Sequence, residues 1–276
     1  MTGTVRGTQR YAAVRGDRDA GLVAAIYGKV ARYPRYGYRM VAGELRADGW
    51  QVSAKRVYRL WRREGLKVAR KARRQRAKGG SANSCANRPA RHKNDVWAVD
   101  FIHDSTATGA TLKMLMIEDE FTRECLALEV GGSRFGGERV AEVLTELFVL
   151  RGVPLGLRSD NGKEFTGVVV SRRLQAAGVE ALAVEAGCPW ENGVVESLNA
   201  IFRDELLNTA ICATVKSARD MATSWRLEYN HRRPHGALGY EAPASYAARC
   251  QAAPGSAPLR PAQPGSEEKG NVLVLS

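Results

Sequence analysis

The segment DVWAVDFIHD, residues 95–104, has the composition of a β-strand and carries a carboxylate in an unexpected place. β-Branched and aromatic residues dominate it, which favours extended backbone. Because side chains alternate between the faces of a strand, Asp100 shares a face with Val96, Ala98 and Ile102. An unpaired carboxylate in such an apolar row is costly. We therefore expect a cation, a metal ion or a proton to compensate Asp100, or else a structural role in which backbone amides bind it.

The residues that follow predict a mixed α/β sheet flanked by helices. Alternating hydrophobic runs, helical periodicity and Gly or Pro punctuation give the order β-β-β-α-β-α-β-α. The predicted elements after the first strand are a hairpin over 111–130 that turns near 119–122, a helix at 138–150, a strand at 155–159, a helix at 167–177 and a strand at 179–184.

A second carboxylate stands where the strand at 155–159 ends, in the segment SDNGKEF, residues 159–165. Carboxylates at strand ends face the cleft in which α/β proteins place their chemistry. Asp160 is thus a candidate site residue. Since Asn161-Gly162 is a strong turn signal, an ordinary Asx turn is the alternative.

The segment ENGVVESLNAIFRDELLN, residues 191–208, predicts a helix with two distinct faces. One face is an apolar stripe and the other is a polar row that contains a third carboxylate, Glu196. Two amides, a carboxylate and a guanidinium in one row indicate a site, although an exposed glutamate without a role is the alternative. The stripe is Val195, Leu198, Phe202 and Leu206, and the row is Asn192, Glu196, Asn199 and Arg203.

Positive charge is concentrated at the N-terminal end of the chain. Residues 1–93 contain 24 Lys+Arg and 5 Asp+Glu, a net +19, so the remainder of a chain of net charge +13 carries −6. A basic segment joined to an acidic body is typical of proteins that bind a polyanion, most often nucleic acid. A basic tail that only aids solubility is the alternative.

Residues 35–66 predict two helices of a helix-turn-helix-like segment. Asp48-Gly49 breaks the first helix, and Ser53 is a suitable N-cap for the second. The second helix has an apolar back and a cationic front, which suits DNA, whereas a solvated face is the alternative. Its apolar residues are Val57, Leu60 and Trp61, and its cations are Lys55, Arg56, Arg59, Arg62 and Arg63.

These patterns divide the chain into five parts. An N-terminal arm is expected over 1–34, ahead of the helical segment. A basic linker follows over 67–93, with ten Lys+Arg that include Lys71, Arg73 and Arg74 as candidate DNA contacts. A core with a C-terminal helical extension is expected over 94–250, and a disordered Pro/Gly/Ser-rich tail over 251–276.

Four motifs, taken in order, resemble the integrase-like transposases of bacterial insertion sequences, in the second-frame product of the IS-three family. They are WAVDF (97–101), RSDNGKEF (158–165), PWENGVVESLNAIFRDELLN (189–208) and YNHRRPHGALGYEAP (229–243). The resemblance covers roughly residues 35–246. It implies a ribonuclease-H-like, retroviral-integrase-type fold with a catalytic and metal-binding triad of Asp100, Asp160 and Glu196.

The resemblance also implies a chemistry. Carboxylate oxygens are ligands that Mg²⁺ or Mn²⁺ accepts, and three carboxylates can share two such ions. The reaction of the family is cleavage of a phosphodiester at the element end, followed by attack of the freed 3′-hydroxyl on another strand. A metal-dependent nuclease that does not join strands, and a catalytically idle DNA-binding protein, are the alternative functions.

The remaining expectations concern DNA and partners. Asn192, Asn199 and Arg203 share the face of Glu196 and are candidates to hold the cleft or to contact DNA. Arg233 and His235 stand near Tyr229 and Tyr240, and cations mixed with aromatic residues suit nucleic acid, with a packing role for the tyrosines as the alternative. The partners implied are element terminal repeats, target DNA, the first-frame product or a fusion with it, and further copies on DNA. No apolar run reaches the ~18 residues of a membrane span, and five scattered cysteines fit a reducing cytoplasm at the bacterial nucleoid.

Overall fold

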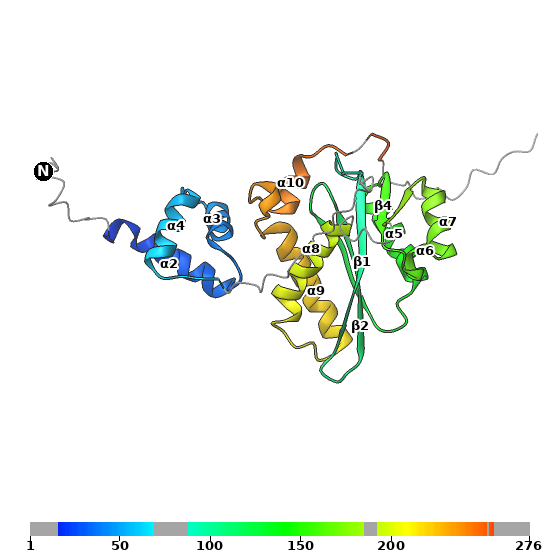
Figure 1. The fold of residues 1–276 in the computed structure, drawn as a ribbon, viewed down its shortest axis with the longest axis horizontal. Coiled ribbons are helices and arrows are strands. Elements are labelled where there is room, and N and C mark those ends of the chain that lie inside the picture. The colour runs from blue at the N-terminus through cyan, green and yellow to red at the C-terminus, as the bar shows by residue number, and fades with distance from the viewer. Residues whose placement is uncertain (1–15, 69–87, 185–191, 253, 257–276) are drawn as a thin grey trace, which may run out of the picture. The chain divides into compact units, whose positions relative to one another are not determined.

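The computed structural model describes residues 16–68, 88–184, 192–252 and 254–256 (Figure 1). The chain divides into two compact units. The first unit contains residues 1–84, 201–211 and 223–249, and the second contains 85–200, 212–222 and 250–276. Residues 201–211 and 223–249, which the sequence analysis assigns to the core, thus group with the N-terminal helices. No helix among the described residues is long and apolar enough to cross a membrane.

The second unit is built on a five-stranded mixed sheet with the strand order β3-β2-β1-β4-β5. The first three strands form an antiparallel meander, and β4 and β5 run parallel to β1. The mixed α/β sheet predicted from the sequence is therefore confirmed. The strands are β1 (Val96–Ser105), β2 (Thr111–Asp119), β3 (Cys125–Gly131), β4 (Gly156–Ser159) and β5 (Glu180–Ala183).

One face of this sheet is covered by α5 (Gly137–Arg151) and α7 (Val168–Ala177). Trp97 and Val99 of β1 point into that core, where α5 contributes Leu144 and Phe148. They alternate with Ala98 and Asp100, as the strand period requires. A single-turn helix, α6 (Lys163–Thr166), was not predicted because four residues are too few for a periodic signal.

The predicted helix over 191–208 is two elements. The helix α8 spans Gly193–Phe202, and a π-helix, η2, continues it over Arg203–Leu207. Val195, Leu198 and Phe202 are buried as expected, but Leu206 is only partly buried. A π-turn holds more residues than an α-turn. Side chains after Arg203 are therefore rotated away from the apolar stripe of α8.

Among the described residues, the N-terminal part of the first unit contains α2 (Gly16–Arg32), α3 (Tyr38–Ala47) and α4 (Ala54–Arg63). The helix α2 corrects the expected N-terminal arm, since Leu22 and Ile26 lie one turn apart and are buried with Leu60 in one core. Ser53 caps α4 as predicted, because its side chain accepts the backbone N–H of Arg56 at 3.2 Å.

The described C-terminal part contains helices joined by turns. It contains α9 (Val215–His231), a 3₁₀ turn η3 (Gly236–Leu238) and α10 (Pro243–Arg249). Most of the predicted linker and tail lies outside the described residues, as does Cys188.

Candidate functional site

Asp100 lies in the middle of β1, partly buried between two fully buried neighbours, Ala98 and Ile102. Its Oδ1 accepts the backbone N–H of Phe101 at 2.7 Å. Its Oδ2 accepts the Nδ2 amide of Asn199, on α8, at 2.6 Å. The compensation expected for this carboxylate therefore includes one backbone amide and one side-chain amide.

Asp160 follows directly on β4, the strand that lies beside β1. Their parallel pairing joins Ala98 to Arg158, so continuing the register by two residues brings Asp160 level with Asp100. The side chain is exposed, and its Oδ1 accepts the N–H of Gly162 at 3.0 Å. The Asx turn given as an alternative is thus present, and it holds the carboxylate just beyond the end of β4.

Glu196 is exposed on α8, three residues before Asn199. Residues at this spacing are neighbours on a helix surface. The hydrogen bond from Asn199 to Asp100 therefore brings the face of α8 that carries Glu196 toward β1.

The other two carboxylates affect Asp100 electrostatically. Burial raises the pKa of Asp100 above its usual range, and the negative charges of Asp160 and Glu196 raise it further. The hydrogen bonds from Phe101 and Asn199 favour the ionised form and oppose the shift. Oxygen donors of this kind suit a hard divalent ion. Within the described residues, however, no three acidic, histidine or cysteine side chains are gathered closely enough to hold a metal ion.

A second acidic cluster, at the turn between β2 and β3, has mostly structural contacts. Asp119 is buried and accepts backbone N–H groups from Asn94, Phe121 and Thr122 at 2.7 to 3.0 Å. Glu120 forms a buried ion pair with Arg158 at 2.7 Å. Glu118 is also buried, and burial raises its pKa well above the usual range.

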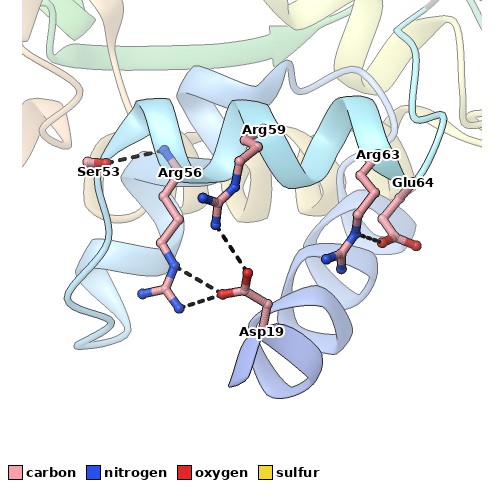
Figure 2. A network of polar contacts seen from close by, with 6 residues as sticks. All are labelled: Asp19, Ser53, Arg56, Arg59, Arg63 and Glu64. Atoms are coloured by element: carbon pink, nitrogen blue, oxygen red, sulfur yellow. Dashed lines mark hydrogen bonds and ion pairs between the residues drawn. The ribbon is translucent and has the colours of Figure 1, made fainter. Parts of the chain in front are cut away.

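The cationic face of α4 forms the wall of a concavity with a volume of about 930 Å³. Lys55 and Arg62 are exposed on it. Arg56 and Arg59 bind the carboxylate of Asp19, on α2, and Arg63 pairs with Glu64 (Figure 2). The five cations predicted for DNA thus share one helix, but three of them have protein carboxylates as partners.

Three other candidate DNA contacts are enclosed or bound to protein groups. Asn192 is 5% exposed, and Asn199 donates to Asp100, so neither amide is displayed on an open surface. Arg233 is 9% exposed, with its Nε 2.9 Å from the carboxylate of Glu205 and its guanidinium over the ring of Tyr229. A buried arginine with a carboxylate and an aromatic partner contributes to packing, because its charge is already satisfied.

The remaining candidate DNA contacts differ in exposure, and some of them lie outside the described residues. Arg203 is exposed at the start of η2, and His235 is partly buried where its backbone N–H donates to Glu241. Lys71, Arg73 and Arg74 lie outside the described residues.

Asp19 is the residue that sequence reasoning missed. It pairs with residues 37 and 40 positions away, and no local period links such partners. The only signal in the sequence is that it is one of few acids in a strongly basic region.

Comparison with known proteins agrees with these observations. Family models described as "Integrase core domain" match residues 90–189 and 177–243, and a model described as "HTH-like domain" matches 16–75. Among solved structures, the magnesium-bound, trimeric HTLV-2 integrase catalytic core domain matches 56% of this chain and 97% of its own at 15% identity, with a TM-score of 0.44.

Relatives among curated proteins are more similar. The uncharacterized 31.7 kDa protein of insertion element IS407 from Burkholderia multivorans is 34% identical over 91% of this chain and 90% of its own. The transposase InsD of insertion element IS2 from Escherichia coli is 27% identical over 83% of this chain and 78% of its own. The chain therefore belongs to the IS-three family of insertion-sequence transposases and combines a helix-turn-helix-like unit with an integrase-type catalytic core.

Proposed function

We propose that this transposase cleaves a phosphodiester at the ends of its element and transfers the freed 3′-hydroxyl to a target strand, with Asp100, Asp160 and Glu196 as its catalytic carboxylates. The observation that carries the proposal is that the elements bearing the other two carboxylates lie next to Asp100. This carboxylate is hydrogen-bonded to the helix of Glu196, and the strand beside it leads into Asp160. Both other carboxylates raise the pKa of Asp100.

The same three side chains are the proposed ligands of divalent ions, Mg²⁺ or Mn²⁺. Their oxygen atoms match the preference of such ions, and the charge that raises the pKa of Asp100 favours a bound cation. A pair of ions held there would activate the attacking oxygen and stabilise the leaving oxygen.

The protein's own residues have simpler tasks in this proposal. Asn199 holds Asp100 in one orientation through the 2.6 Å hydrogen bond to Oδ2. The Asx turn at Gly162 limits the movement of Asp160. Since both displacements occur in line at phosphorus, no serine or cysteine nucleophile is required.

Partners follow from the same reaction. The proposed substrates are duplexes that carry the element's terminal repeats, together with target DNA. We also propose that the chain works with a first-frame product, or fused to it, and as more than one copy on DNA. The place of action is then the bacterial nucleoid, in the cytoplasm.

The first prediction concerns Glu196→Gln, which keeps the shape of the side chain and removes its charge. The rate of joining of an end-containing duplex in Mg²⁺ should fall at least about 100-fold. Loss of a group that orients a metal ligand costs about 10–100-fold, and loss of the ligand itself should cost at least as much. DNA affinity should be nearly unchanged. The assay measures cleavage and joining separately, with the full chain and the first-frame product, and Glu138→Gln on an exposed turn of α5 is the control.

Joining by Glu196→Gln at the wild-type rate would show that Glu196 is not a ligand. If the wild-type protein cleaves but never joins, the nuclease alternative is correct. If it does neither while it binds DNA, the idle DNA-binding alternative is correct.

A further inference from the structure

Asp19 is a buried carboxylate in the most basic part of the molecule. Its side chain is 6% exposed, whereas the side chains of Arg56 and Arg59 are 41% and 54% exposed. Figure 2 shows both guanidinium groups directed at this one carboxylate. Oδ1 accepts Nε and Nη2 of Arg56 at 3.2 and 2.6 Å, and Oδ2 accepts Nη2 of Arg59 at 3.1 Å.

These contacts orient the two arginines without using all their donors. A guanidinium carries five N–H groups in a fixed plane. Arg56 and Arg59 are three residues apart and so lie on one face of α4, and Asp19 reaches them from α2. Both side chains are therefore held in direction, and both line the concavity.

The charge of Asp19 argues against a surface selected only for phosphate affinity. Nonspecific affinity rises with each cation that meets a phosphate, and a carboxylate among the cations lowers it. A structural link between α2 and α4 is also not required, because Leu22, Ile26 and Leu60 already join these helices in the core. What the carboxylate adds is orientation, which reduces the side-chain entropy lost when an arginine binds.

We propose that Asp19 is a positioning residue for sequence recognition: it fixes Arg56 and Arg59 so that α4 reads base edges in duplex DNA. Guanine is the base that a fixed guanidinium recognises best, through O6 and N7 in the major groove. Asp19 then contributes to discrimination between sequences and reduces general affinity. This inference rests on the proposed DNA function of the chain but not on its catalytic carboxylates.

The test compares the full-length wild type with Asp19→Asn. Wild-type protein selects duplexes from a randomised pool, and both proteins are titrated with the best selected duplex and with an unselected one at several salt concentrations. Asp19→Asn should lower the ratio of the two affinities by about 5-fold or more, the value of a lost bidentate base contact. Affinity for the unselected duplex should stay equal or rise, because a negative charge is removed.

Asp48→Asn is the matched control. It removes the same charge from an acid that is 50% exposed and pairs with Lys29 at 2.8 Å in the same helical unit. It should leave the affinity ratio unchanged. If Asp19→Asn and Asp48→Asn give the same ratio, or if the wild type selects no sequence, the proposal is wrong.

A second pair of variants decides the matter if Asp19→Asn does not fold. Arg56→Lys and Arg59→Lys keep the charge but lack the planar fork, so they should lose discrimination and retain affinity for the unselected duplex. Unchanged discrimination in both would overturn the proposal. These measurements need no strand cleavage. A result that overturns the role of Asp19 therefore leaves the proposed catalytic role of Asp100, Asp160 and Glu196 untouched.

Discussion

At residue scale, the acids at 118–120 differ in how their charge is compensated. Asp119 accepts three backbone N–H groups, and Glu120 pairs with Arg158. Glu118 is fully buried, and among the described residues its Oε2 has no hydrogen-bond partner. Burial therefore holds its pKa well above the ordinary value of 4.5.

The second prediction follows from that shift. A carboxyl whose pKa is raised in the folded state binds a proton on folding, so stability is lost as the pH rises above the unfolded pKa. Glu118→Gln removes this proton uptake. As the pH rises, the free energy of unfolding of the wild type should therefore fall more steeply than that of Glu118→Gln. The difference in slope should be up to about 1.4 kcal/mol per pH unit.

Thermal unfolding between about pH 5 and pH 8 measures the effect. Relative to wild type, Glu118→Gln should gain melting temperature toward the alkaline end, whereas Glu138→Gln, at an exposed position, should not. Parallel curves for Glu118→Gln and wild type would mean that Glu118 ionises normally in the folded protein.

At the scale of the element, α8 carries two functions on adjacent faces. Val195, Leu198 and Phe202 are buried and anchor it, while Asn199 donates to Asp100 one turn after Glu196. The amide of Asn199 thus contacts a catalytic candidate, whereas the sequence left a role in the cleft and a contact with DNA both open.

The third prediction separates these two roles. Asn199→Ala should slow strand joining by about 10–100-fold, as is typical when a group that orients a metal ligand is removed, and should raise the Mg²⁺ concentration required. The dissociation constant for DNA should not change. Ser197→Ala, exposed on the same helix, is the control. Weaker DNA binding with a normal joining rate in the bound complex would restore Asn199 as a DNA contact.

At the scale of the whole molecule, charge is segregated along the chain, with +19 over residues 1–93 and −6 over the remainder by the count given above. Lys55 and Arg62 are exposed cations of the basic part, and Arg172 and Lys216 are exposed cations of the acidic part. If the basic part supplies general DNA affinity, removing the charges of Lys55 and Arg62 should weaken DNA binding more than removing the equal charge of Arg172 and Lys216.

The fourth prediction tests this difference. Changing Lys55 and Arg62 to Gln should weaken binding to an unselected duplex and reduce the slope of log affinity against log salt by up to about 1.8, since each lost phosphate contact removes about 0.9. Changing Arg172 and Lys216 to Gln should have a much smaller effect. Equal changes in slope would show that the whole surface binds DNA without preference for the basic part.

Periodicity in the sequence was enough to predict the hairpin, the strand with Asp100, the Ser53 cap and the buried faces of α4 and α8, because each depends on residues within a few turns. The resemblance of four motifs selected Asp100, Asp160 and Glu196. Local patterns of this kind state which face of an element a residue occupies.

Only the tertiary structure decided which groups contact the residues on that face. Asp19 holds Arg56 and Arg59, Asn199 binds Asp100, and Arg233 is buried against Glu205. A cation or an amide has the same period in a helix whether its partner is DNA, a carboxylate or water. The partner depends on packing between segments far apart in the chain. The sequence by itself therefore predicted the sheet, the helices α3, α4, α5, α7 and α8 and the candidate triad, but not these pairings.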